Sequence, residues 1–416
     1  MIRLRGSVPA SLAPLTVLLA CADPSLDVAE RRDPVVYGQD DRQDVFAVAD
    51  PVWRARATRS AMALVPPDRL AVDEAAGTVG LEASVYGEHF GLCEGQRFFE
   101  QLRLGRCSGT LVDTDLVLTA GHCVPNQARC DDRRFVFEWA VEAEGEVPTL
   151  TPADIYECAE IVRTVDGTFG GRRLDFAFIR LDRPPPAPYE PAPLRPDDGA
   201  LPEGTPVTLI GFPNGLPVKV AANGAVVNPR ADVRDFFEAT VDAFGGNSGS
   251  GVYDDQGRLA GVLVRGEQDY AETDAGCDVV NVLDGERTAE EGAEDITYAA
   301  RAVEDLCLQG YRGDHLCVPG DQTWCFPCEA DADCRAGWTC GGFAQNARLK
   351  FCRAPCAEDG DCRADHACAE GGCTPRLGPA CVGPDVWVRE ACGRNVAPVM
   401  ACPEDQRCAV VAGEAA

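Results

Sequence analysis

Residues 107–123 read CSGTLVDTDLVLTAGHC. Two short runs of β-forming residues flank the turn residues Asp-Thr-Asp, a pattern that predicts two neighbouring strands. His122 follows the second run directly and has small residues before it. A lone histidine is usually structural or simply exposed, so its role depends on which reactive groups the rest of the chain supplies.

A second stretch, FGGNSGSGV at residues 244–252, holds Ser248 among glycines, and either a flexible turn or a nucleophile scaffold explains it. A serine hydroxyl is too weak an acid to ionise alone, and a neighbouring imidazole solves this. His122 is the best placed histidine, because the others lie in a loop-like or a cysteine-rich setting (His89, His315, His366). A buried carboxylate must then orient the imidazole, and Asp175 stands at the head of the apolar run DFAFIRL.

From about residue 75 to 305, short β-branched or aromatic runs alternate with Gly, Pro and Asp, which predicts an all-β barrel or sandwich. The runs DFAFIRL and AGVLV are nearly continuous in apolar residues, so we expect strands buried on both faces. The proline-rich segment 182–204 predicts a surface connection between two halves of this region. A helix is expected only over residues 296–308, ITYAARAVEDLCL.

The overall composition limits the classes of function. The formal net charge of the 416 residues is −29, which repels phosphate backbones, so no nucleic-acid partner is expected. The chain has 22 cysteines and only four histidines, which favours disulfides in an oxidising compartment over metal sites. Neither a metal nor another cofactor is predicted.

The N-terminus predicts export. Residues 1–21, MIRLRGSVPASLAPLTVLLAC, place two arginines before an apolar run that is too short to span a bilayer, as in a signal peptide. The ending LLAC is similar to a bacterial lipobox, in which Cys21 would be lipidated and attach the protein to a membrane. An ordinary signal peptide cut nearby is the alternative. Residues 22–40 then form an N-terminal extension or a pro-segment, and the protein is secreted or a lipoprotein of the cell envelope.

The composition changes at residue 307, because fifteen cysteines fall in residues 307–416. Cys328, Cys334 and Cys340 have the spacing C-x5-C-x5-C, which Cys356, Cys362 and Cys368 repeat 28 residues later. Small units with little core need covalent cross-links, so we expect disulfide-rich modules here. Attachment, substrate recruitment and inhibition all fit such a tail, and its expected partner is an unknown protein or surface.

Together, TAGHC, DFAFIRL and GNSGSG resemble the catalytic motifs of chymotrypsin-fold serine proteases, in the order of that fold. The resemblance covers roughly residues 41–306 and implies two Greek-key β-barrels with the active site between them. It also implies a disulfide between Cys107 and Cys123. In such a site His122 is the general base, Asp175 orients it, Ser248 is the nucleophile, and the backbone N–H groups of Gly246 and Ser248 bind the oxyanion.

Some residues depart from the digestive members of the family. Asn247 replaces an aspartate that pairs with a newly released amino terminus, so activation by that ion pair is not expected. The form GNSGS, and VVYGQDDR near the start, are similar to the bacterial glutamyl-endopeptidase branch. Asp242 and Arg265 stand where the walls of a specificity pocket are expected, and they would favour basic or acidic substrates respectively; both being structural is the third alternative. Cys93–Cys130 is a candidate second disulfide.

The resulting hypothesis is an exported serine endopeptidase that acts on protein or peptide substrates through an acyl-enzyme. Its alternative is a catalytically silent, protease-like protein that binds through the cysteine-rich tail. A purely structural envelope lipoprotein has no support beyond Cys21. With Cys21 processed, 21 cysteines would remain, an odd number that predicts one free or intermolecular thiol.

Overall fold

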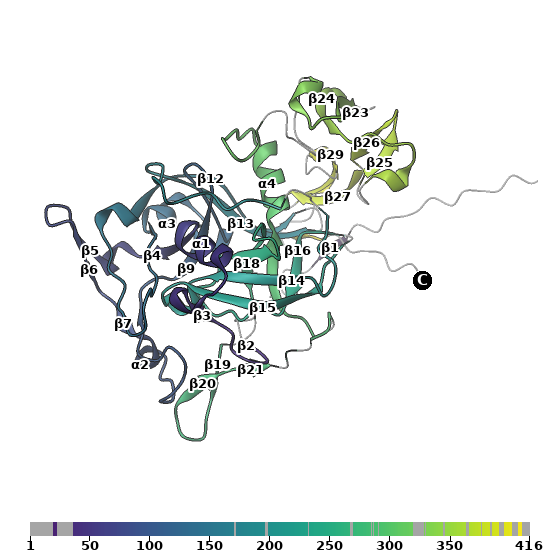
Figure 1. Cartoon of the computed structure of the whole chain (residues 1–416). Helices are drawn as coiled ribbons and strands as arrows, with labels where there is room; N and C mark the ends of the chain where they lie inside the picture. The colour runs from purple at the N-terminus through teal and green to yellow at the C-terminus, as the bar shows by residue number, and fades with distance from the viewer. Residues whose placement is uncertain are drawn as a thin grey trace, which may run out of the picture.

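The computed structural model in Figure 1 describes most of the chain from residue 36 onward. The described residues are 20–22, 36–169, 172–195, 199–231, 233–266, 269–283, 285, 287–289, 291–318, 328, 330–343, 346–362, 366–375, 377–382, 385–390, 395–401 and 407–409. The expected signal peptide and most of the expected extension, residues 1–19 and 23–35, lie outside them. Only the backbone of Cys21 is described, in β1 (Ala20–Ala22), which pairs with β30 (Arg407–Ala409). Lipidation at Cys21 therefore stays a prediction.

A closed barrel of six strands forms the first half of the protease-like region. Its strands follow one another around the ring in the order β10-β13-β12-β11-β4-β9. Phe176 and Phe178 of β13 are fully buried, as predicted from the continuous apolar run. The bounds are β4 Ala61–Val65, β9 Cys107–Asp113, β10 Leu116–Thr119, β11 Arg134–Val136, β12 Ile155–Phe169 and β13 Arg172–Leu181.

The second half is a sheet in the order β14-β17-β18-β22-β16-β15-β3. Because β14 also pairs with β15, six of these strands close into a second ring, and β3 (Gln43–Asp44) lies outside it on β15. The predicted two-barrel fold is thus confirmed, and the proline-rich segment connects the barrels between β13 and β14. The bounds are β14 Pro206–Gly211, β15 Lys219–Asn228, β16 Phe236–Ala239, β17 Gly251–Asp254, β18 Leu259–Arg265 and β22 Glu294–Tyr298.

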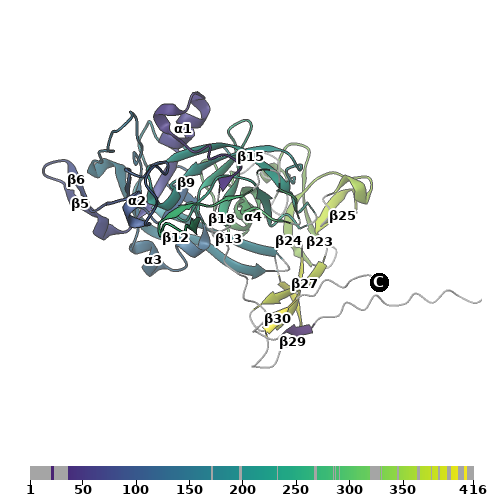
Figure 2. The same ribbon diagram turned by 90° about the horizontal axis from the view of Figure 1, so that it is seen from below.

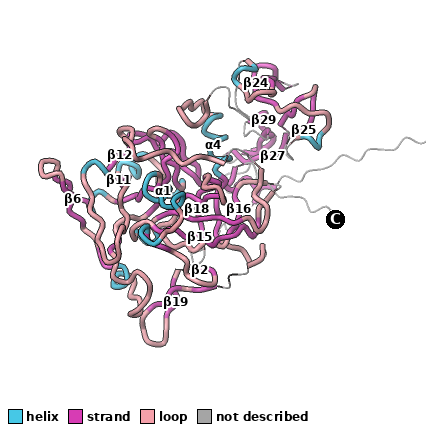
Figure 3. Tube along the Cα trace, in the orientation of Figure 1, coloured by secondary structure: helices cyan, strands magenta, loops and turns pink. Residues whose placement is uncertain are grey.

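Helices are short and lie at the edges of the barrels, as Figure 3 shows. The predicted helix is α4 (Ala299–Leu308), whose apolar face packs against strands of both barrels. The expectation of no other helix is wrong, because α1 (Pro51–Arg59), α2 (Tyr86–His89) and α3 (Gln127–Asp131) also form. In α1 the Asp50 carboxylate caps the Val52 N–H at 2.8 Å, but the helix buries only Ala57 and so lacks an apolar stripe. Among the described residues, no helix is long and apolar enough to cross a membrane.

Small two-stranded sheets surround the barrels. An unexpected disulfide links Cys277, directly before β20 (Asp278–Val280) in one of these sheets, to Cys93. Cys93 bonds Cys277 and Cys130 bonds Cys158, so the expected pair Cys93–Cys130 is wrong. Every cysteine side chain that the structure describes is in a disulfide. The prediction of one free or intermolecular thiol therefore concerns cysteines whose side chains lie outside the described residues. The pairs are β2 (Val36–Tyr37) with β21 (Val282–Leu283), β5 (Leu70–Asp73) with β6 (Thr78–Leu81), β7 (Ser84–Val85) with β8 (Leu102–Arg103), and β19 (Tyr270–Glu272) with β20 (Asp278–Val280).

The cysteine-rich repeat forms two similar modules beside the barrels, seen at one side of the molecule in Figures 1 and 2. The first contains Cys328–Cys340 and Cys334–Cys352, and the second Cys356–Cys368 and Cys362–Cys373. Each module has one hairpin, β23 (Thr339–Phe343) with β24 (Asn346–Arg353), or β25 (His366–Ala369) with β26 (Gly372–Pro375). A three-stranded sheet follows, made of β27 (Leu377–Val382), β28 (Asp385–Glu390) and β29 (Asn395–Ala401).

A buried carboxylate joins the start of the tail to the first barrel. Asp113, which is 1% exposed, accepts the backbone N–H groups of Asp314, His315 and Leu316 at 3.2, 3.1 and 3.0 Å. These residues belong to the loop closed by Cys307–Cys317. That loop therefore packs against the first barrel, although it follows the change in composition at residue 307.

Candidate active site

His122 and Asp175 meet at the edge of the first barrel. His122 lies in the single turn η4 (Gly121–Cys123) that follows β10, and β10 pairs with β13, which carries Asp175. The His122 Nδ1 is 2.8 Å from Asp175 Oδ2, while Asp175 Oδ1 accepts the N–H of Gly121 at 2.6 Å and of His122 at 3.2 Å. Asp175 is 1% exposed, whereas the His122 side chain is 27% exposed. The carboxylate fixes the ring, and the other ring nitrogen is left for proton transfer.

The loop around Ser248 owes its shape to glycine. Gly246 and Gly249 have φ values of 88° and 90°, a region that residues with a Cβ rarely adopt. A Cβ on Gly249 would also lie 2.0 Å from the carbonyl oxygen of Ser108. Within the loop, Asn247 accepts the Phe244 N–H at 3.0 Å and donates to Ser250 Oγ at 3.0 Å. Asn247 thus stabilises the loop by hydrogen bonds within the loop itself. In the digestive members of the family, an aspartate at this position instead forms an ion pair with the newly released amino terminus.

Ser108, a residue that sequence reasoning missed, ties this loop to the first barrel. It is fully buried, its N–H donates to the Ser248 carbonyl oxygen at 2.8 Å, and its Oγ donates to the Gly246 carbonyl oxygen at 2.8 Å. The only signal for it in the sequence is its position directly after Cys107.

The disulfide at the site brings the serine loop next to the histidine turn. Cys107 and Cys123 are bonded, with a Cα–Cα distance of 6.3 Å. Cys123 Sγ lies 3.7 Å from the Ser248 carbonyl oxygen, and Cys123 is the residue after His122. The structure shows no hydrogen bond between the His122 ring and the Ser248 hydroxyl. Such bonds often tighten only when substrate binds.

The two expected oxyanion donors differ from their neighbours in the loop. The N–H groups of Asn247, Gly249 and Ser250 donate to the carbonyl oxygens of Phe244, Leu263 and Asn247. The N–H groups of Gly246 and Ser248 donate to no acceptor among the described residues. Backbone donors that are not used by the fold are what an oxyanion site requires.

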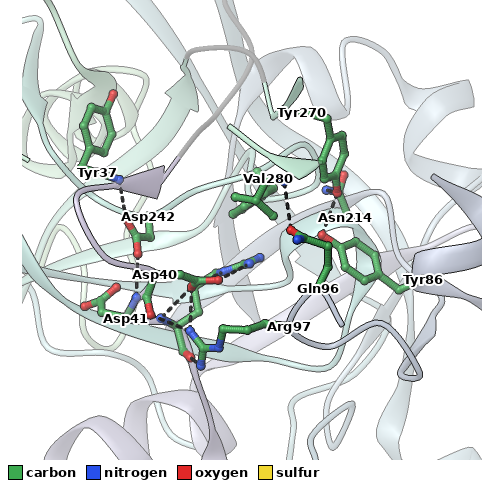
Figure 4. A network of polar contacts seen from close by, with 12 residues as sticks. Tyr37, Asp40, Asp41, Tyr86, Gln96, Arg97, Asn214, Asp242, Tyr270 and Val280 are labelled. Atoms are coloured by element: carbon green, nitrogen blue, oxygen red, sulfur yellow. Dashed lines mark hydrogen bonds and ion pairs between the residues drawn. The ribbon is translucent and has the colours of Figure 1, made fainter. Parts of the chain in front are cut away.

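Asp242 contacts the N-terminal segment of the described chain. Its carboxylate is buried and accepts the backbone N–H groups of Tyr37 and Asp41, both at 2.8 Å (Figure 4). Burial, together with the neighbouring Asp41 carboxylate, raises the pKa of Asp242 above its usual range. These contacts favour the structural alternative for Asp242, because its acceptor atoms bind the N-terminal segment.

The N-terminal segment 36–44 supports the serine loop from behind. Arg42 is buried, and its guanidinium lies 3.8 Å from the centre of the Phe244 ring, which directly precedes the loop. Arg42 is also ion-paired with Asp40 at 2.7 Å. The nearby β19–β20 hairpin adds Tyr270, whose hydroxyl contacts Tyr86 and Asn214 (Figure 4). The likeness of VVYGQDDR to a mature N-terminus was the signal for this segment.

Arg265 also contacts acidic residues of the protein. Its Nη2 is 3.4 Å from Asp175 Oδ2, and its Nη1 is 3.8 Å from Asp295 Oδ2. Asp295 is largely buried, and burial raises its pKa to about 6, although Arg173 and Arg265 act in the opposite direction. Asp242 and Arg265 do not pair with each other, and their roles in substrate preference stay predictions.

Clusters of sulfur atoms lie close enough together to suggest metal sites. One includes Cys107, His122 and Cys123, and two lie in the repeat modules. The cysteines of all three clusters are in disulfides, so they provide no thiolates for a metal.

Comparison with known proteins agrees with this geometry. Residues 107–262, which include all three candidate catalytic residues, match the family model of the trypsin-like peptidase domain. Residues 107–262 are therefore similar to a trypsin-like peptidase domain, and the two barrels have the chymotrypsin-like fold.

The other comparisons add less. A solved structure of a Glu endopeptidase in complex with MPD is 18% identical, with a TM-score of 0.35, and the match covers 64% of this chain and 95% of that one. No curated protein matched the chain.

Proposed function

We propose that the protein is an exported serine endopeptidase that hydrolyses peptide bonds through His122, Asp175 and Ser248. The observation that carries the proposal is the 2.8 Å contact between His122 Nδ1 and the buried Asp175 carboxylate, beside the loop of Gly246 and Gly249 that holds Ser248. The similarity of residues 107–262 to the trypsin-like peptidase domain supports a peptide or protein as the substrate. All three groups are of the type that acyl transfer needs.

In the proposed reaction, the second ring nitrogen of His122 takes the proton of Ser248 Oγ as that oxygen attacks the scissile carbonyl carbon. The carbonyl π electrons move to the oxygen, and the N–H groups of Gly246 and Ser248 stabilise the charge. His122 then passes its proton to the leaving amine as the C–N bond breaks. A water molecule, deprotonated by His122, attacks the acyl carbon; the bond from that carbon to Ser248 Oγ then breaks, and His122 returns the proton to Oγ.

Export is supported by the disulfides that join distant parts of the chain, such as Cys93–Cys277, because such bonds persist in oxidising compartments. The signal-like residues 1–21 support the same conclusion, with Cys21 as the proposed lipid attachment site. The protease domain is proposed to span residues 41–306, and the tail from 307 to bind a protein or surface. The cleavage preference is left unassigned, because Asp242 and Arg265 contact the fold.

The test is hydrolysis of casein by the purified, oxidised full-length protein and its Ser248→Ala variant. Ser84→Ala is a matched control, because the buried Ser84 hydroxyl has no hydrogen-bond partner among the residues that the structure describes. We expect hydrolysis by the wild type and the control, and none by Ser248→Ala. A folded wild type without hydrolysis, together with retained binding of the tail to a protein or surface, would instead support the silent binding protein.

A further inference from the structure

Arg265 connects the two barrels behind the candidate triad. It is the last residue of β18 in the second barrel, whereas Asp175 lies on β13 in the first. Its guanidinium is 16% exposed and reaches three carboxylates, with Asp175 and Asp295 at the distances above and Asp166 at 3.9 Å. A specificity residue must keep its charge for the substrate, but this cation is already paired with acids of the protein.

The contact also solves an electrostatic problem. Asp175 is almost fully buried, and a buried carboxylate is costly unless a cation or hydrogen-bond donors compensate it. Its resting partner, the imidazole of His122, supplies a hydrogen bond but no charge when it is neutral. Arg265 is the cation nearest to Asp175 among the ion pairs of the described residues, and its Nη2 contacts the same oxygen, Oδ2, as His122 Nδ1.

On the basis of the proposed function, we infer that Arg265 is a positioning residue of the triad, which holds the Asp175 carboxylate ionised and oriented toward His122. It acts through Asp175 and does not select the substrate side chain. Because Arg265 Nη2 and His122 Nδ1 contact the same Asp175 oxygen, replacing Arg265 by a neutral residue should change the pH dependence of the reaction.

Other charged groups lie near the contact between Arg265 and Asp175, on the strands around it. Arg173 of β13 is 3.5 Å from Asp295 and offers a second cation that also bridges the barrels. The charged groups near Arg265, Asp175 and Asp295 are His122, Asp166, Arg173, Arg230 and Glu238. Arg173 has no ion pair with Asp175, so it serves as the matched control.

The test measures the second-order rate of Ser248 labelling by a fluorophosphonate, which needs no known substrate, from about pH 4 to about pH 9. For Arg265→Gln we expect the acidic limb of the profile to move up by about half to one pH unit, and the plateau rate to fall several-fold. Arg265→Lys keeps the charge but not the forked contact, so it should lower the plateau with a smaller shift of the limb. Arg173→Gln should shift the limb by less than half as much as Arg265→Gln.

Three results overturn the inference. The first is a wild-type profile for Arg265→Gln, or for Arg265→Lys if the Gln variant does not fold. The second is an equal shift in Arg173→Gln, which would assign the effect to the junction of the barrels. The third is a wild-type labelling profile for Arg265→Gln together with a selective loss of peptide cleavage. In a matched pair of peptides, the variant would then lose cleavage after Glu but keep cleavage after Gln, which would make Arg265 a residue of the specificity pocket. A folded wild type that is not labelled at any pH overturns the proposed function as well, and so differs from all three.

Discussion

The two barrels and the two repeat modules are stabilised in different ways. The barrels close their strands around buried aromatic side chains such as Phe176, Phe178 and Phe237. The modules have few buried apolar residues, chiefly Phe351, and instead contain disulfides that span 11 to 18 residues. Units this small bury too little surface to fold alone, so covalent links replace the core.

The same side chain also has different roles in the two regions. In the barrels, Asp175 is buried beside a histidine. In the modules, Asp331 accepts the Cys340 N–H at 2.6 Å and Asp359 accepts the Cys368 N–H at 2.8 Å, at the same place in each repeat. We therefore expect the chemistry to depend on the barrels alone, and the predictions below test this separation.

The largest effect is expected for Asp175→Asn. The amide can hold His122 in the wrong tautomer and cannot stabilise the imidazolium, so hydrolysis should fall by about 10⁴-fold. Casein hydrolysis and fluorophosphonate labelling measure it, with thermal unfolding as the control for folding. A loss of less than about tenfold would contradict the assigned role of Asp175.

The next effect is on stability and is confined to the tail. Replacing both Cys334 and Cys352 by serine should cost the first module about 2–5 kcal/mol and unfold it locally. Limited proteolysis with mass spectrometry should find new cleavage within residues 330–353, while Ser248 is labelled at the wild-type rate. Reduced labelling would mean that the module takes part in the active site.

A smaller effect is expected where the two regions meet. Asp113→Asn replaces one acceptor oxygen by a donor that faces backbone N–H groups of residues 314–316, at a cost of about 1–3 kcal/mol. Hydrogen exchange at these amides should increase. Unchanged exchange there would show that Asp113 does not hold the tail.

The smallest effect concerns pH. Burial raises the pKa of Asp295 to about 6 from its usual 3.8, so between these values the folded state holds a proton that the unfolded state has lost. Stability therefore falls as pH rises through this window. Asp295→Asn cannot titrate, so its Tm minus the wild-type Tm should increase by a few degrees between about pH 4 and about pH 7. A constant difference would mean that Asp295 is ionised throughout.

Local patterns predicted the elements whose character depends on their own residues. The buried strand of DFAFIRL, the helix at 299–308 and the repeated modules were all expected from composition and spacing. The helix α1 was not, because an exposed helix shows no apolar period, although Asp50 and Pro51 are start signals.

The contacts that could not be predicted join distant parts of the chain. Cys93 and Cys277 are 184 residues apart and meet only because both barrels have closed. Asp242 and Arg265 had the expected positions in the sequence, but their partners, Tyr37, Asp41 and Asp175, are supplied by the tertiary fold. Spacing predicts which residues share an element, but it does not predict which charges become paired.

The most direct test of the account is mass-spectrometric mapping of the fluorophosphonate adduct in the wild type and in His122→Ala. We predict a single adduct on Ser248 in the wild type and none in the folded His122→Ala variant, because the serine then has no base. An adduct on a different serine, or equal labelling of Ser248 without His122, would contradict the central claim that these two residues form one catalytic unit.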